Sequence, residues 1–204
     1  EGVFKRETID VEIPQRKKDP IIFSEDEFIR EETTLEILGK LRPAFRKDGS
    51  VTAGNSSGVN DGAGAILLAS ENMVKKYNLA PKARVVSSAV VGVEPRIMGI
   101  GPIEAAKKAL ARAGLTFDDM DVIELNEAFA AQALGCSREL GLADNDPRIN
   151  PQGGAIALGH PLGMSGARIV TSAFYQLQRS EAKKALCTMC IGVGQGIAMV
   201  IEKV

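Results

Sequence analysis

The chain has 204 residues, of which 45% are hydrophobic and 25% are charged, so it is long enough to bury a sizeable core. That composition excludes a disordered or collagen-like chain. The 25 Lys and Arg residues nearly balance the 26 Asp and Glu residues, and a formal net charge of -1 leaves no bulk positive field for nucleic acid or an anionic membrane. We therefore expect neither partner, and any anionic ligand must be held by local groups.

Two further observations bear on the cellular context. No apolar run reaches the roughly 20 residues that a membrane-spanning helix needs, so we expect a soluble protein. The sequence contains 3 Cys residues, which is an odd number and too few for a disulfide framework. A reducing compartment, and hence a cytoplasmic location, is the simpler interpretation.

The first part of the chain, residues 1 to about 58, is dense in charge and has no sustained hydrophobic period. It predicts a strand near Val11, a helix from about Thr33 to Leu41, and otherwise loop. The glycine-rich stretch 51–64 then opens onto the apolar run 65–69. That change of composition indicates a loop that leads into a buried strand.

A more regular part begins with a short helix that starts at Ser70 and ends before Pro81. Pro102 in a first turn and Gly114 beyond a last turn delimit the next helix. The further predicted elements are strands at 83–93, 121–125, 185–191 and 196–202, and helices at 127–140 and from about 164 to 179. This order predicts an α/β layered fold in which helices flank a mixed sheet that ends in a hairpin.

His160 is the single histidine of the chain, and it lies within G-G-A-I-A-L-G-H-P-L-G-M-S-G at 153–166. A lone histidine is usually a surface residue or a satisfied core residue. Here five glycines and a proline hold the ring in a tight loop ahead of a helix, where other backbones can approach it closely. Because imidazole titrates near neutral pH, a general acid or base is the leading functional interpretation.

Cys187 and Cys190 form a C-x-x-C pattern, which invites a redox or zinc interpretation. A redox pair normally opens a helix, whereas this pair lies in an apolar strand, where residues three apart point to opposite faces. A structural zinc site would need Cys136 and His160 from distant segments, so we expect no metal. Cys190 instead precedes the glycine turn 192–196, where a thiol can exchange a proton and backbone N–H groups can face an oxyanion.

Asn126 and Glu127 stand between a predicted strand end and a predicted helix start. One interpretation is that Asn126 caps the helix and Glu127 lies in its first turn. The other is that Asn126 positions a water or a donor at a ligand site, because open α/β sheets bind ligands at strand ends. Both interpretations remain open at this point.

Three motifs together resemble the C-terminal half of the coenzyme A thiolases, the family of acetyl-CoA acyltransferases and acetyl-CoA acetyltransferases. They are N-E-A-F-A at 126–130, G-G-A-I-A-L-G-H-P-L-G-M-S-G-A-R at 153–168 and C-I-G-V-G-Q-G at 190–196. The loop V-T-A-G-N-S-S-G-V-N-D-G-A at 51–63 is similar to the substrate-binding stretch of that family. The resemblance covers nearly the whole chain.

The resemblance implies a subunit of two similar βαβαβαββ halves with an inserted loop domain. Residues 1–58 would then be the end of the loop domain, which binds substrate, and residues 59–80 the last elements of the N-terminal half. Residues 81–204 would form the thiolase C-terminal domain. A homodimer or homotetramer is implied for a full-length protein.

The family makes or breaks the bond between the α and β carbons of a 3-oxoacyl-CoA, with coenzyme A and acetyl-CoA as substrates and no covalently bound cofactor. The resemblance implies that His160 activates a nucleophilic cysteine and that Cys190 is the acid or base. It further implies that Asn126 holds a water at the enolate oxygen and that the N–H of Gly192 lies in a second oxyanion hole. The nucleophile belongs to the N-terminal half, and we interpret Cys136 as structural, so this chain alone is expected to be inactive.

The resemblance also assigns residues that contact CoA. Arg30 corresponds to a contact with the adenine and phosphates, whereas Ile37 stands where some members have a serine. The other positions line the nucleotide and pantetheine, and the plainer interpretation as core residues is strongest for Met98 and Phe129. The full set is Arg30, Phe45, Ala53, Ser57, Met98, Ala128 and Phe129.

Two functions remain open on the sequence. One is a thiolase whose nucleophile lies in another part of the protein, and the other is a non-catalytic CoA-binding or assembly module derived from a thiolase. Retention of His160, Cys190 and Asn126 together favours the first. The segments 93–102 and 144–151 look more like thiolases that cleave 3-oxoadipyl-CoA (beta-ketoadipyl-CoA). Its far carboxylate could bind Arg96 or Arg148, unless these are solvated loop residues.

Overall fold

The structure is a computed structural model that describes residues 2–204, and the chain forms two compact units that divide between Lys40 and Leu41. The first unit contains a 3-10 turn, a two-stranded sheet and a short helix. Its elements are η1 (Val3–Arg6), β1 (Val11–Ile13), β2 (Ile21–Phe23) and α1 (Leu35–Gly39). β1 and β2 pair antiparallel, and the Thr34 side chain caps α1 by accepting a hydrogen bond from Ile37 N.

The predicted strand near Val11 and the predicted helix after Thr33 are confirmed in this first unit. β2 lies where loop was predicted. A strand of three residues is too short to show a period of two, so only its pairing with β1 defines it.

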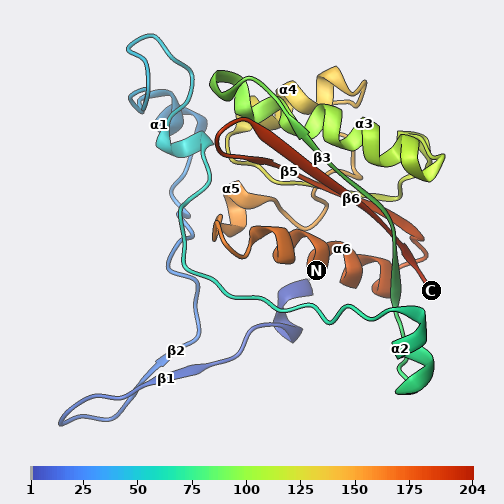
Figure 1. The fold of residues 1–204 in the computed structure, drawn as a ribbon. Coiled ribbons are helices and arrows are strands. Elements are labelled where there is room, and N and C mark those ends of the chain that lie inside the picture. Colours follow the sequence, from blue (N-terminus) through green and yellow to red (C-terminus); the bar gives the residue numbers. More distant parts are fainter. Residues whose placement is uncertain (1) are drawn as a thin grey trace. The chain divides into compact units, whose positions relative to one another are not determined.

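The second unit holds the four-stranded sheet of the molecule (Figure 1). Its strands follow the order β3-β6-β5-β4, with β4 and β5 parallel and the other two pairs antiparallel, which confirms the mixed sheet. The elements of the second unit, in chain order, are η2 (Ala53–Asn55), α2 (Glu71–Lys76), β3 (Ala83–Gly92), η3 (Pro95–Ile100), α3 (Gly101–Ala113), η4 (Phe117–Asp119), β4 (Val122–Leu125), α4 (Ala130–Glu139), α5 (Ala155–Leu158), α6 (Ser165–Arg179), β5 (Lys184–Ile191) and β6 (Gln195–Lys203).

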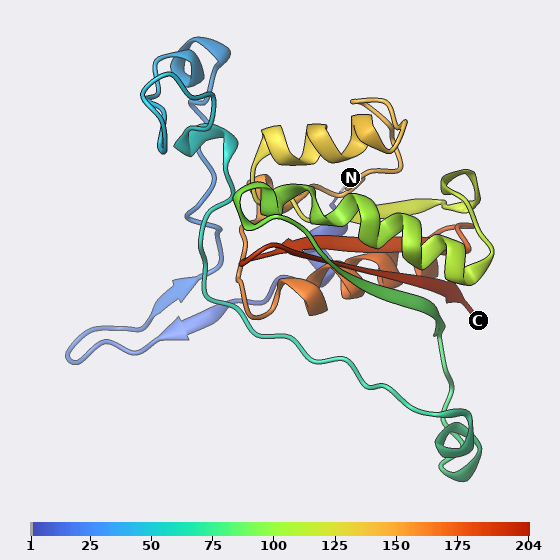
Figure 2. The same ribbon diagram turned by 45° about the horizontal axis from the view of Figure 1, so that its top comes forward.

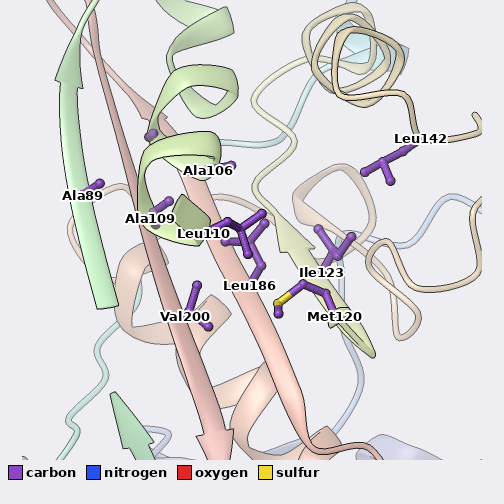
Figure 3. Close-up of a cluster of buried hydrophobic side chains, with 11 residues drawn as sticks. Ala89, Ala106, Ala109, Leu110, Met120, Ile123, Leu142, Leu186 and Val200 are labelled. Atoms are coloured by element: carbon purple, nitrogen blue, oxygen red, sulfur yellow. The ribbon is translucent and has the colours of Figure 1, made fainter. Parts of the chain in front are cut away.

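Helices cover both faces of this sheet, with α3 on one side and α6 on the other (Figures 1 and 2). Pro102 lies in the first turn of α3, and Gly114 ends it with a left-handed φ of 67°. Small and branched side chains of α3 pack on the sheet around Leu186 and Val200 (Figure 3). The α6 face has its own apolar cluster, to which Leu177 and Cys187 contribute.

The alternation of side chains along β5 separates the two cysteines of the C-x-x-C pattern. Cys187 belongs to the apolar cluster under α6, whereas Leu186 belongs to the cluster under α3. Cys190 lies three positions after Cys187, on the opposite face, and all three cysteines of the chain are free thiols. The pattern is therefore two separate buried thiols.

Three predicted elements differ from the structure. Residues 65–69 form no strand and are exposed, because no described strand pairs with them. β3 is less buried than predicted, since it is an edge strand with Val85 and Val90 exposed. α4 begins at Ala130 rather than at 127, because Phe129 is extended with φ -145°. Within residues 2–204, no helix is both long enough and apolar enough to cross a membrane.

Candidate active site

The candidate site lies at the carboxyl ends of the two parallel strands, β4 and β5. Asn126 directly follows β4, and its N–H donates to Thr188 O of β5 at 3.0 Å. Cys190 lies two residues beyond Thr188, near the end of β5. Because parallel strands end at the same edge of a sheet, the predicted Asn126 and Cys190 lie at one edge.

His160 reaches this edge on a loop between α5 and α6 whose backbone is held by residues 58–60. The His160 N–H donates to Gly58 O at 2.8 Å and to Asn60 Oδ1 at 3.2 Å. Gly159 has a left-handed φ of 89°, and a Cβ there would overlap the Asn60 side chain. The glycine before His160 therefore permits both the turn and the close approach of the 58–60 segment.

The hydrogen bonds of Ser165 assign the tautomer of His160. Ser165 is fully buried, and its hydroxyl donates to Pro161 O at 3.0 Å. Ser165 Oγ lies 2.6 Å from His160 Nδ1. Because the hydroxyl proton already binds Pro161 O, Oγ must accept a hydrogen bond from Nδ1–H. In the neutral ring, Nε2 then carries no proton and its lone pair can accept a hydrogen bond. Asn126 Nδ2 lies 3.4 Å from that Nε2 and donates toward it.

The electrostatic environment keeps His160 neutral. Burial is the main effect that lowers the pKa of His160, and the positive charge of Arg168 lowers it further. Arg168 Nη2 also donates to Asn126 Oδ1 at 3.4 Å, which turns the Asn126 amide nitrogen toward the imidazole. The structure thus places Asn126 beside His160, and the role of Asn126 in holding a water stays a prediction. The capping interpretation of Asn126 is wrong, since α4 begins four residues later.

Cys190 is buried at the end of β5, and burial raises the pKa of its thiol. The turn that follows contains Val193 and Gly194, both with left-handed φ, at 67° and 87°. Gly192 is exposed in that turn, with open space where a side chain would stand. Its role in an oxyanion hole stays a prediction.

Cys136 has the properties of a structural thiol. It lies inside α4, is fully buried, and its Sγ donates to Gly99 O at 3.4 Å. Burial raises the pKa of Cys136 to about 11. A thiol with this pKa is almost entirely protonated at neutral pH, so it is a poor nucleophile.

Five of the predicted CoA contacts lie on or beside the loop 53–57. Ser57 donates from N and Oγ to Ala128 O at 3.1 and 3.2 Å, and the rings of Phe45 and Phe129 meet edge to face with centroids 5.7 Å apart. Ala53 lies in η2, four residues before Ser57. Contact of these residues with CoA stays a prediction.

The remaining CoA positions are placed differently. Met98 lies in η3 and, like Phe129, is half-buried rather than part of a core cluster, so the core interpretation is wrong for both. Arg30 is exposed in the first unit, and its contact with CoA also stays a prediction.

Sequence reasoning missed a buried polar network on the α6 face. Glu124 of β4 is almost fully buried, and Gln176 Nε2 of α6 donates to its Oε1 at 2.5 Å. Burial raises the pKa of Glu124 to about 7, although the hydrogen bond from Gln176 and the positive charge of Arg168 both act to lower that pKa. Ser165 and Arg168 stand five and eight residues after His160, within the motif at 153–168. Their closeness to His160 in the sequence was the available sign that they support it. Among residues 2–204, no three His, Cys, Asp or Glu side chains cluster as metal ligands would.

Comparison with protein families places this site. The profile of the thiolase C-terminal domain matches residues 79–203, and the profile of the thiolase N-terminal domain matches residues 1–72. The chain therefore belongs to the thiolase family, which confirms the resemblance carried by the three motifs.

Individual relatives sharpen this assignment. The chain is 61% identical over 203 residues to a beta-ketoadipyl-CoA thiolase of Acinetobacter baylyi, covering 100% of this chain and 51% of the relative. It is similar to the crystal structure of the Bacillus anthracis acetyl-CoA acetyltransferase, with TM-score 0.90, 44% identity, and coverage of 100% of this chain and 51% of that one. It also matches human mitochondrial 3-ketoacyl-CoA thiolase in complex with CoA, with TM-score 0.84, 53% identity, and coverage of 90% and 46%. The chain thus spans about half the length of the curated relatives it matches.

Proposed function

We propose that this chain supplies the acid-base part of a thiolase that cleaves or forms a 3-oxoacyl-CoA. In the cleavage direction, a cysteine thiolate outside this chain attacks the 3-oxo carbon. The bond between the α and β carbons breaks, and its electron pair becomes the enolate of acetyl-CoA. A proton returns to the α carbon, and the thiol of free CoA then takes the acyl group from the cysteine.

The observation that carries this proposal is the unprotonated Nε2 of His160, whose lone pair meets only the long 3.4 Å contact from Asn126 Nδ2. The Ser165 hydroxyl forces the proton onto Nδ1, and the lowered pKa keeps the ring neutral, so Nε2 can take a proton from a thiol. Once protonated, Nε2 becomes a donor. It then stands beside Asn126 Nδ2, so that two donors can face a developing enolate oxygen, directly or through a water.

Cys190 suits the proton transfer to carbon. Its raised pKa keeps the thiol protonated at neutral pH, so in the cleavage direction it is ready to give a proton to the α carbon. In the synthetic direction the same thiol must first give its proton to the CoA thiolate that leaves during acylation. The resulting Cys190 thiolate then removes the α-proton of acetyl-CoA, which preorganised donors at the enolate oxygen make more acidic.

For the substrate, we propose an acyl-CoA with a dicarboxylic acyl chain, 3-oxoadipyl-CoA. The support is the beta-ketoadipyl-CoA thiolase named among the relatives. The structure removes one candidate cation: Arg148 pairs with Asp146 and also donates to Phe117 O and Met120 O, so it holds its own loop. Arg96 remains, exposed and bonded to Glu94 through Nε alone.

The test joins this chain to the remaining half of the Acinetobacter baylyi relative, which gives a hybrid protein of full length. We expect thiolysis of 3-oxoadipyl-CoA by the hybrid protein, with kcat/KM above that for acetoacetyl-CoA, and no turnover by the 204-residue chain alone. A hybrid protein that folds and binds CoA but catalyses nothing would contradict the function. A ratio of one or less would contradict the substrate. We also propose that the full-length protein is a homodimer or homotetramer, which the mass of the hybrid protein in solution tests.

A further inference from the structure

The outer edge of β4 is closed by the segment 148–150. Ile123 N donates to Arg148 O at 2.8 Å, and Asn150 N donates to Ile123 O at 2.9 Å. The Asn150 side chain continues this pairing: its Oδ1 accepts from Leu125 N at 2.9 Å, and its Nδ2 donates to Leu125 O at 2.8 Å. Asn150 thereby fixes the backbone of the residue directly before Asn126.

Glu127 fixes the other side of Asn126. Its Oε1 accepts from Asn150 Nδ2 at 2.7 Å, and its Oε2 accepts from the N–H of Ile156 in α5 at 3.1 Å. The carboxylate lies flat against Gly154, where any Cβ would overlap it. One side chain thus joins the end of β4 to α5, and α5 ends two residues before His160.

We propose that Asn150 and Glu127 form a clamp that sets the spacing between Asn126 and His160. The two residues are positioning residues, since neither is placed against the reacting atoms. Asn126 lies between two residues that the clamp holds, and the 3.4 Å separation of its Nδ2 from His160 Nε2 depends on where α5 is held. This inference rests on the proposed function, in which these two side chains act together at one oxygen.

Two substitutions open the clamp in different ways. In Glu127→Gln, the amide nitrogen must face either Asn150 Nδ2 or the N–H of Ile156, so one hydrogen bond becomes a clash of two donors. Asn150→Gly removes the side chain, yet glycine accepts the left-handed φ of 46° at this position. Ser87→Ala is the matched control, because it also removes one hydrogen bond, from Ser87 Oγ to Ala109 O at 2.7 Å, but on the α3 side.

The first readout is turnover by the hybrid protein. We expect Glu127→Gln and Asn150→Gly each to lower kcat about 10- to 100-fold, because small displacements of catalytic groups cost this much, with KM changed less than about twofold. Ser87→Ala should leave kcat unchanged. The double variant Glu127→Gln/Asn150→Asp is compared with Glu127→Gln and with Asn150→Asp alone, which also loses the bond to Leu125 O. In the double variant the glutamine can donate to the new carboxylate and still accept from Ile156, so it should lose less than the product of those two single losses.

The second readout needs no turnover. Since His160 is the single histidine, the 15N resonances of its ring are unambiguous in the 204-residue chain. We expect both clamp variants to shift the Nε2 resonance, which senses the Asn126 donor, while Nδ1 stays with Ser165. Unchanged Nε2 resonances with a loss of stability like that of Ser87→Ala would overturn the clamp. An inactive wild-type hybrid protein would reject the proposed function instead, and the resonances would still decide on the clamp.

Discussion

The two faces of the four-stranded sheet are built from different kinds of side chain. On the α3 face the apolar cluster consists of alanine, leucine, isoleucine, valine and methionine, as Figure 3 shows. On the α6 face the apolar cluster gives way, toward the ends of β4 and β5, to buried Glu124, Gln176, Asn126 and His160. The α3 face therefore holds the larger apolar cluster, while the α6 face also holds polar groups whose burial is costly unless they are paired.

Adjacent residues of β4 contribute to opposite faces of the sheet. Ile123 packs into the α3 cluster, while Val122 packs into the α6 cluster, so Glu124 points to the same side as Val122. A period of two thus lets one strand serve both faces. Substitutions on either face should therefore separate stability from chemistry.

The largest effect is expected at the candidate site, to which His160 and Cys190 both belong. In the hybrid protein, His160→Ala should lower kcat/KM at least about 100-fold, because both the proton acceptor and the enolate donor are lost. Cys190→Ala should abolish exchange of the α-proton of acetyl-CoA with solvent and still permit some acylation. Burst acylation and proton exchange, followed separately, check this division. Equal loss of acylation in both variants would refute it.

On the apolar face, Leu186→Ala should cost about 3 kcal/mol of unfolding free energy, from lost burial and the cavity that remains. Leu186 is fully buried, whereas Leu67 is 85% exposed, so Leu67→Ala is the control and should change stability by less than about 0.5 kcal/mol. Urea denaturation measures both. The ring resonances of His160 should stay in place in Leu186→Ala, and their displacement would show that the faces are coupled.

The last expected effect is a dependence of the unfolding free energy on pH, which reaches its full size only across the whole titration of Glu124. The pKa of Glu124 is raised from 4.5 to about 7, so the folded chain keeps a proton that the unfolded chain releases. Its contribution to stability is present below pH 4.5 and is lost as the pH rises through 7, a change of up to about 3 kcal/mol. Glu124→Gln should remove this loss.

His160 contributes with the opposite sign, because its lowered pKa makes the folded chain less stable as the pH falls below about 6.5. That contribution is common to both proteins, so it cancels when the variant is compared with the wild type. Urea denaturation between pH 4.5 and 8 gives the comparison. Parallel curves for the two proteins would contradict a raised pKa at Glu124.

The sequence predicted the elements whose signals are local. β3, α3 and the hairpin of β5 and β6 follow from apolar periodicity and from the marks left by Pro102 and Gly114. The run 65–69 was predicted wrongly, because an apolar stretch becomes a strand only when another strand pairs with it. Composition does not show whether such a partner is within reach.

The site was predicted at the level of residues but not of contacts. His160, Asn126 and Cys190 stood out through glycines, strand ends and family motifs. The residues that hold the site in place did not stand out, because their hydrogen bonds join positions far apart in the sequence. Asn150 lies 25 residues after Leu125, and Gln176 lies 52 residues after Glu124. A polar residue at such a position looks like any loop or helix residue until the fold brings its partner near.

Burial of the three thiols also governs how fast the protein is oxidised and how its unfolding can be measured. Burial raises the pKa of Cys136, Cys187 and Cys190, so each holds very little thiolate, the form that oxidants and alkylating reagents attack. In the folded chain these sulfurs should be slow to form sulfenic acid or mixed disulfides. Unfolding exposes all three thiols to solvent, so the rate of thiol labelling reports the fraction of molecules that are unfolded.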